Sequence, residues 1–210
     1  MIEYHKIQTV YLRDAETKYK TLLEAQYTEI EFEYLASNRW VFTEKVDGTN
    51  IRVMVSLAGD PITFRGKTDN ASIPASLERR LEERFLTQRD RLYEIFPDGV
   101  CLYGEGYGAR IQKGGGNYRP DVDFVLFDVK IGESWLSRDS VEDIAEKLNI
   151  DHVPIIGRGT LPEMVAMART GFKSRWGDFA AEGIVARPAV ELVGRNGRRI
   201  ITKIKTRDFG

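Results

Sequence analysis

The amino-acid sequence predicts an α+β fold, in which strands alternate with amphipathic helices. Two observations lead to this prediction. Apolar, β-branched and aromatic runs of strand length recur between turn signals, while other segments repeat their apolar residues every three or four positions, as helices packed on a core do. The strand-like segments are 40–43, 51–55, 62–64, 100–103, 123–130 and 200–204.

The expected helices follow from the spacing of their apolar residues. Residues 14–27 place Tyr19, Leu22 and Leu23 on one face and are expected to form the first helix, before a strand-rich stretch over 28–64. One long charged helix is expected over 76–96, from the spacing of Leu77, Leu81 and Phe85. A shorter helix is indicated by apolar residues at Val141, Ile144, Ala145 and Leu148. Another begins at a capping box, Thr160–Glu163, and ends near Gly171.

Composition and charge fit a compact enzyme and exclude several classes of protein. The 210 residues suit one large domain or two small ones, and 42% hydrophobic residues suffice for a core. With 31 basic and 32 acidic residues the chain is not a polycationic coat, so any nucleic-acid contact must come from a local basic face. The sequence starts without the apolar run of a signal peptide and holds no membrane-length run, so a cytosolic location without membrane contact is expected.

Cysteine and histidine offer no site of their own. Cys101 is the only cysteine, which excludes an internal disulfide, and its apolar neighbours predict a buried strand residue. His5 and His152 lack the partner spacing of a zinc site or a catalytic dyad, so both are expected to be structural or surface residues.

The most informative segment is the heptapeptide Glu44–Asn50, with the sequence Glu-Lys-Val-Asp-Gly-Thr-Asn. It places the amine of Lys45 between two predicted strands, beside a turn for which Gly48 supplies a permissive backbone. A strand end next to a tight turn can hold a nucleophile rigidly at the mouth of a cleft. Taken alone, the segment is equally well read as a hairpin turn with a solvated lysine.

The heptapeptide matches Lys-x-Asp-Gly-x-Asn, the nucleophile motif of the covalent nucleotidyltransferases, which include RNA ligases, DNA ligases and mRNA capping enzymes. DNA ligases and capping enzymes usually carry arginine at the position of Asn50. With asparagine there, the motif resembles that of the RNA ligases, in the branch of phage RNA ligase 2 and the RNA-editing ligases. The resemblance covers residues 40–209. Its four other motifs follow in family order, at 102–108 with Glu105, 124–129 with Phe127, 181–185 with Glu182, and 203–205 with Lys203 and Lys205.

The resemblance implies a nucleotidyltransferase (ATP-grasp-like ligase) fold of mostly antiparallel sheets flanked by helices. It also suggests that residues 1–210 form a single adenylyltransferase domain without the C-terminal OB or helical domain that such ligases commonly carry. The sequence leaves two alternatives open, a natural minimal ligase and an excised domain.

The chemistry that the resemblance implies is attack of the Lys45 amine on the α-phosphate of ATP, which expels pyrophosphate and leaves lysyl-AMP. A free lysine is almost wholly protonated at neutral pH and cannot attack. Neighbouring cations, namely Lys203, Lys205, Arg65 and a divalent metal, would favour the neutral amine and neutralise phosphate charge. Period-two geometry supports the pairing, because it places both late lysines on one strand face with Ile204 toward the core.

The resemblance further implies roles for carboxylates and nucleotide-binding residues. Glu182 and Glu105 are the expected oxygen ligands of Mg²⁺ or Mn²⁺, and Glu105 is assigned mainly to a ribose hydroxyl. Arg65 would contact the nucleotide and the RNA end, against the alternative of a surface arginine. Glu44 is assigned to the neighbourhood of the adenine edge. Asn50 is assigned to a phosphate or to the attacking hydroxyl, with turn formation as the alternative. Phe127, rather than Phe124, is expected to stack on the base, and the alternative is that both lie in the core.

The expected partner is RNA with 5′-phosphate and 3′-hydroxyl ends, and the sequence leaves protein partners open. Two basic segments are candidate RNA contacts. The first is the glycine-rich loop 111–119 with Lys113, Tyr118 and Arg119, which lacks the order of a P-loop, and the second contains Arg195, Arg198 and Arg199. A surface connection and a solvated hairpin tip are the alternatives. Other functions left open are a minimal DNA ligase or capping-type enzyme, and a nucleotide-dependent RNA-binding module that does not seal.

Overall fold

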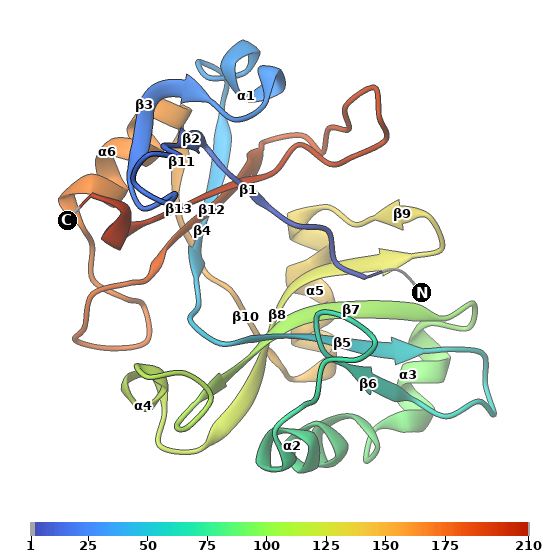
Figure 1. Ribbon diagram of the computed structural model, residues 1–210. Helices are drawn as coiled ribbons and strands as arrows, with labels where there is room; N and C mark the ends of the chain where they lie inside the picture. The colour runs from blue at the N-terminus through green and yellow to red at the C-terminus, as the bar shows by residue number, and fades with distance from the viewer. Residues whose placement is uncertain (1–2, 210) are drawn as a thin grey trace. The chain divides into compact units, whose positions relative to one another are not determined.

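A computed structural model describes residues 3–209 of the chain. The chain packs as two compact units, each with its own sheet and apolar core. Unit 1 contains residues 3–5 and 47–153, and unit 2 contains residues 6–46 and 154–209. Helices and mostly antiparallel sheets occur in both units (Figure 1), so the predicted α+β class is confirmed. The expectation of a single adenylyltransferase domain stays a prediction.

Unit 1 is built on a sheet with the strand order β10-β8-β7-β5-β6, and β9 also pairs with the end of β8 (Figure 1). All its pairings are antiparallel except the one between β10 and β8. The strands are β5 (Thr49–Val55), β6 (Thr63–Arg65), β7 (Val100–Gly108), β8 (Val122–Ile131), β9 (Ser134–Trp135) and β10 (Asp151–His152).

One face of this sheet forms the core of unit 1 together with three helices. Side chains alternate along each strand, so Ile51 and Val53 of β5 and Leu102 of β7 point into this core. Cys101, beside Leu102, is buried in β7, which confirms the predicted buried strand residue. Burial raises the pKa of its thiol. The helices of unit 1 are α2 (Ala75–Phe85), α3 (Arg89–Ile95), α4 (Gly115–Tyr118) and α5 (Arg138–Leu148).

The single helix predicted over 76–96 is wrong, because the segment forms α2 and α3 with a break between them. Gln88 has non-helical backbone angles, and its side chain donates to the carbonyl of Arg84 at 2.8 Å and to that of Leu148 at 3.2 Å. The side chain thus satisfies a carbonyl at the end of α2, which the helix would otherwise leave without a partner. The inward positions Leu77 and Leu81 agree with the predicted spacing.

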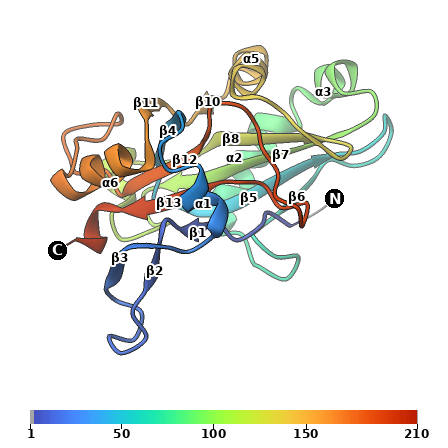
Figure 2. The ribbon, with the colours of Figure 1, turned by 90° about the horizontal axis from the view of Figure 1, so that it is seen from above.

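Unit 2 is built on a sheet with the order β1-β13-β12-β4-β11, in which only β1 and β13 run parallel. Helix α6 (Leu161–Thr170) lies beside β12 and β13 in Figures 1 and 2, and begins at the predicted capping box with Thr160. Within residues 3–209, no helix is long and apolar enough to cross a membrane. The other elements of unit 2 are β1 (Gln8–Thr9), β2 (Tyr11–Arg13), β3 (Leu22–Tyr27), α1 (Ile30–Tyr34), β4 (Trp40–Lys45), β11 (Ile155–Gly159), β12 (Gly183–Pro188), β13 (Thr202–Lys205) and the 3₁₀ helix η1 (Thr206–Asp208).

The helix predicted over 14–27 is wrong. Asp14 instead begins a turn, in which its carboxylate accepts the Glu16 N–H at 2.9 Å and its carbonyl accepts the Tyr19 N–H at 2.9 Å. Local capping of this kind competes with a helix, and the chain returns as β3, antiparallel to β2. Figure 2 shows this pair of strands in blue. The strand-rich stretch predicted over 28–64 is likewise interrupted by α1.

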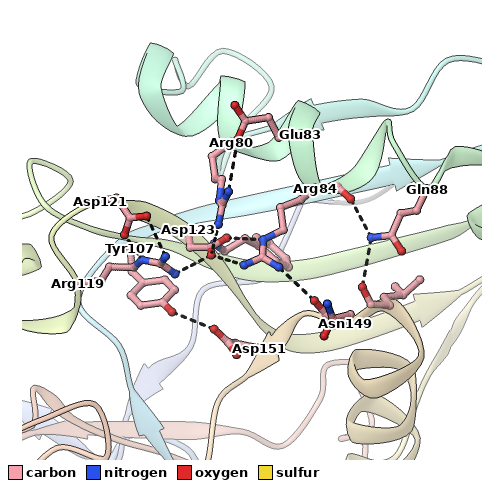
Figure 3. A network of polar contacts seen from close by, with 12 residues as sticks. Arg80, Glu83, Arg84, Gln88, Tyr107, Arg119, Asp121, Asp123, Asn149 and Asp151 are labelled. Atoms are coloured by element: carbon pink, nitrogen blue, oxygen red, sulfur yellow. Dashed lines mark hydrogen bonds and ion pairs between the residues drawn. The ribbon is translucent and has the colours of Figure 1, made fainter.

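A charged network connects three elements of unit 1 around Asp123 of β8, as Figure 3 shows. Its carboxylate is fully buried and accepts hydrogen bonds from Arg80 and Arg84 of α2 and from Arg119, which follows α4. The Phe124 N–H donates to the same carboxylate at 2.9 Å. Burial would raise the pKa of Asp123, but the bonds from Arg84 and Arg80 outweigh burial and hold that pKa below its ordinary value.

Asp123→Asn is expected to lower the free energy of unfolding by about 3 kcal/mol, because it leaves the guanidinium groups around a neutral amide. Since the folded pKa is depressed, the carboxylate stabilises the wild type at neutral pH and loses this effect as pH falls below the ordinary aspartate value of about 3.9 and through the folded pKa. Urea unfolding across pH checks both points. The exposed Asp121 is the control, and Asp121→Asn should cost under about 1 kcal/mol. Equal effects of the two variants would contradict the prediction.

Candidate active site

Lys45 ends β4, the strand that lies between β12 and β11 in unit 2. The preceding residues of β4 are buried, whereas the Lys45 side chain is 21% exposed. Its Nζ donates to Oε2 of Glu182 at 2.6 Å. Glu182 precedes β12, whose Gly183 is paired with Lys45 across the strands. Strand pairing therefore brings together two residues that are 137 positions apart in the sequence.

The carboxylate of Glu182 connects two lysines. Its Oε1 lies 2.7 Å from Nζ of Lys205 in β13, while its Oε2 holds Lys45. The close approach of β12 to β13 at this point depends on Gly183, because a Cβ there would lie 2.8 Å from the Cα of Lys205. Lys203 is half-buried like Lys205, and Ile204 between them is fully buried, so the predicted shared face of the two lysines is confirmed. Three sequence-predicted charges, Lys45, Glu182 and Lys205, thus form one cluster.

The cluster contains a single carboxylate. Among the residues that the structure describes, no group of three or more histidine, cysteine, aspartate or glutamate side chains could hold a metal ion. Mg²⁺ nevertheless fits a site of this kind, since it keeps several waters and is often bound through one or two carboxylates together with substrate phosphates. Glu182 is the residue of unit 2 whose oxygens suit such an ion.

Glu44, directly before Lys45, has a different environment. Its side chain is buried, at 1% exposure, and its carboxylate accepts hydrogen bonds from Ser174 Oγ at 2.6 Å and from the Arg175 N–H at 2.8 Å. Burial raises the pKa of Glu44, and these bonds lower it less. Sequence reasoning missed Ser174, because a lone serine 130 positions away gives no signal. The expected contact of Glu44 with adenine stays a prediction.

The turn after Lys45 is held by the glycine-rich loop of unit 1. The Asp47 N–H donates to Oη of Tyr118 at 3.2 Å, and Nε2 of Gln112 donates to the carbonyl of Gly48 at 3.0 Å. Tyr118 is buried at the end of α4. The loop is therefore not a loose surface connection. The expected RNA contact of Arg119 stays a prediction, and its guanidinium is bound to two aspartates, Asp121 and Asp123.

Four predicted nucleotide-binding residues belong to unit 1. Asn50 of β5 is paired with Glu105 of β7, so the two side chains lie next to each other on the face opposite the core. Arg65 of β6 is exposed and is paired with Arg52, two residues beyond Asn50 and therefore on the same face. The Oδ1 atom of Asn50 is buried and accepts no hydrogen bond from residues 3–209. Buried acceptors are normally satisfied, so this atom suits a donor supplied by a ligand.

The structure distinguishes the two phenylalanines of β8. Phe124 is 1% exposed and belongs to the core of unit 1, where its ring packs against Phe85. Phe127 lies at a β-bulge, since Leu126 and Asp128 pair with adjacent residues of β7. Its half-buried ring is outside that core and meets the ring of Tyr4 edge-on, with centroids 5.0 Å apart. The Phe127 ring is therefore the more accessible of the two.

The second basic segment, between β12 and β13, divides into two kinds of residue. Arg199 is buried and bound to Glu191 at 2.5 and 2.9 Å, and its expected RNA contact stays a prediction. Arg195 is exposed, and Arg198 is exposed with Glu29 at 3.7 Å. Exposed cations of this segment thus remain near its tip.

A family model described as RNA ligase matches residues 38–205. Similar structures include an apo variant of the RNA ligase of Naegleria gruberi, with a TM-score of 0.71 and 18% identity over 99% of this chain and 56% of that one. A variant of that ligase with ATP and Mn has a TM-score of 0.70 and 18% identity, over 97% and 56% of the two chains. The same ligase with PPi has a TM-score of 0.70 and 19% identity, also over 97% and 56%. The chain thus spans about half the length of these proteins, and no curated protein matches its sequence.

Proposed function

Because the chain belongs to the RNA ligase family, we infer that it is an ATP-dependent RNA ligase that works through a lysyl-AMP intermediate. The observation that carries this proposal is the cluster in which Glu182 holds the ammonium groups of Lys45 and Lys205. A lysine that ends a strand, beside a second cation and a carboxylate, has the groups that attack on a phosphate requires. The cytosolic location expected from the sequence remains part of this proposal.

The proposed reaction has three steps. First, the neutral amine of Lys45 forms a bond to the α-phosphorus of ATP, while the bond to the pyrophosphate oxygen breaks and the amine loses a proton. Next, a 5′-phosphate oxygen of the RNA attacks the same phosphorus and releases the lysine. Finally, the 3′-hydroxyl attacks the RNA phosphorus, loses its proton and releases AMP. No step needs an oxidant or a reductant.

Unit 2 residues would act mainly on charge. Lys205 and Lys203 neutralise the phosphates, and their shared strand face aims both cations at one phosphate chain. Glu182 orients the amines of Lys45 and Lys205 through its two oxygens. A Mg²⁺ or Mn²⁺ ion held by Glu182, and in part by Glu105, would add positive charge at the phosphates. The Naegleria gruberi ligase with ATP and Mn supports the choice of nucleotide and metal.

Unit 1 residues would act mainly on the nucleotide. We assign Glu105 to a ribose hydroxyl, with its neighbour Asn50 at a phosphate or at the attacking hydroxyl. Phe127 would stack on the adenine, and its half-buried position outside the core supports this choice over Phe124. Arg65, which is exposed on β6, would contact the nucleotide and the RNA end. Glu44 would act near the adenine through its backbone, because its carboxylate is already bound.

A labelling experiment tests the proposed nucleotide and strand. Purified protein with Mg²⁺ should form a covalent adduct with α-labelled ATP in preference to the other nucleotides. It should then join a 5′-phosphorylated RNA end to a 3′-hydroxyl RNA end in preference to all-DNA ends, since the 2′-hydroxyl and A-form geometry distinguish the two. Labelled AMP should therefore appear first on protein, then on RNA, and last as free AMP.

The alternatives predict different products. Equal or faster sealing of all-DNA nicks would identify a minimal DNA ligase, and an adduct with GTP would identify a capping-type enzyme. RNA binding without any adduct, from protein shown to carry no prior AMP, would identify a module that does not seal. Each of these results would overturn the proposed RNA ligase.

A further inference from the structure

The loop between α6 and β12 has a defined structure in unit 2. Residues 172–181, named the 172–181 loop here, are closed by hydrogen bonds from the Ser174 N–H to the Phe179 carbonyl at 2.9 Å and from the Ala181 N–H to the Phe172 carbonyl at 3.0 Å. The loop leads directly into Glu182, the carboxylate that holds Lys45. Its conformation therefore bears on the site where the proposed chemistry occurs.

The loop is fixed from beneath by Glu44. This buried carboxylate accepts hydrogen bonds from the Ser174 hydroxyl and from the backbone N–H of Arg175. The Ser174 hydroxyl in turn accepts the backbone N–H of Trp176 at 3.1 Å. A buried carboxylate that lost these donors would keep the full cost of desolvation. The contacts of Glu44 thus favour one loop conformation, and a preordered loop loses little entropy when it binds a partner.

The loop combines two exposed cations with an aromatic ring. Arg175 is exposed, and Trp176 is half-buried. The Lys173 side chain is 65% exposed, and its pairing with the exposed Asp178 at 2.9 Å is of the weak surface kind. Cations that track phosphates, together with a ring that stacks on bases, are the usual surface for a single-stranded nucleic acid.

Two of the other basic candidates of the chain are held in ion pairs, while Arg195 and Arg198 remain exposed. Arg119 is bound to two aspartates, and Arg199 is bound to Glu191. We propose that the 172–181 loop is a binding site for the RNA strand, with Arg175 and Lys173 at its phosphates and Trp176 stacked on one of its bases. This inference rests on the proposed function for its ligand, and it assigns the strand a position next to Lys45 and Glu182.

Direct binding tests the proposal without ligation. A fluorescent single-stranded RNA with a 5′-phosphate is titrated with wild-type protein, Trp176→Ala and Arg175→Ala, and the dissociation constant is measured against salt. Trp176→Ala should weaken binding about tenfold to a hundredfold, in line with loss of one stacked base. Arg175→Ala should weaken binding and reduce the salt slope by about one. Trp176→Phe should restore most of the affinity, because its ring still stacks.

Matched controls come from the same unit. Tyr34 and Arg39 are exposed on or near α1, so Tyr34→Ala and Arg39→Ala should bind RNA as the wild type does. Thermal unfolding identifies any variant that has lost its fold, and such a variant is replaced by Trp176→Leu, which also lacks a ring that stacks, or by Arg175→Gln. Wild-type affinity and salt slope in folded Trp176→Ala and Arg175→Ala proteins would overturn the proposal.

Adduct formation separates this inference from the proposed function. Trp176→Ala should form lysyl-AMP from labelled ATP at the wild-type rate and then transfer AMP to RNA at least tenfold more slowly at subsaturating RNA. If the wild type forms no adduct while the two variants still lose RNA affinity, the proposed ligase is wrong and the binding site stands. If the adduct forms and transfer is unchanged in both variants, the ligase stands and the binding site is wrong.

Discussion

Lys45→Ala is expected to abolish covalent adduct formation with ATP, because in the proposed reaction the Lys45 amine forms the bond to phosphorus. Lys45→Arg should abolish it too, since a guanidinium stays protonated and is not a usable nucleophile. The wild type should gain one AMP in an acid-labile linkage, and mass spectrometry of peptides should place it on Lys45. This is the largest effect expected of any substitution in the chain.

Lys147 provides the control for this experiment. It is an exposed lysine of α5 in an ion pair with Asp143, so Lys147→Ala should form the adduct at the wild-type rate. Wild-type protein that stays unlabelled, after removal of any AMP already bound, would refute the assignment of Lys45 and the enzyme with it.

Glu182→Ala should reduce adduct formation by about 10²–10³-fold, the range seen when one group that stabilises transition-state charge is removed. Its carboxylate orients Lys45 and Lys205 at once, and without it two ammonium groups are left to repel each other. Lys205→Ala should fall in the same range. Because the three side chains are partly exposed, both variants should unfold close to the wild-type temperature. Single-turnover labelling at saturating ATP, beside thermal unfolding, measures both quantities.

Glu24 is a matched control for Glu182. It lies in the same unit and also pairs with a cation, Arg169, but the pair is about half exposed and distant in the chain from any predicted motif. Glu24→Ala should leave labelling unchanged. If Glu182→Ala formed the adduct with labelled ATP as fast as Glu24→Ala does, Glu182 would have no part in the chemistry.

Local patterns predicted most strands and the helices α5 and α6 well, because each has its own repeat of apolar residues. The failures arose where a side chain ends an element. Nothing in the spacing of Leu77, Leu81 and Phe85 shows that Gln88 will hold two carbonyls and break the helix. Likewise, the apolar residues near Leu22 look helical until Asp14 is known to cap a turn and β3 to pair with β2.

The candidate site divides in the same way. Alternation along one strand was enough to place Lys203 and Lys205 on a common face. The partner of Glu44 depends on a loop 130 residues away, which no local rule reaches. Phe127 differs from Phe124 because of a bulge in β8, and a strand period of two contains no bulge. The ion pairs of Arg119 and Arg199 were not predicted, because the partners of a basic residue cannot be read from the sequence alone.

Gly183 constrains any attempt to redesign this protein. A methyl group at that position would meet the main chain of β13 rather than a side chain that could turn aside. Gly183 of β12 is paired with Lys45 of β4 on one side and with Lys205 of β13 on the other. The distance between the two lysines is thus set by the close approach of these backbones at a residue without a side chain. A directed-evolution library for bulkier triphosphates would gain nothing from diversity at position 183. Its useful variation lies at residues whose side chains can be exchanged without moving a strand, such as Phe127 and Arg65.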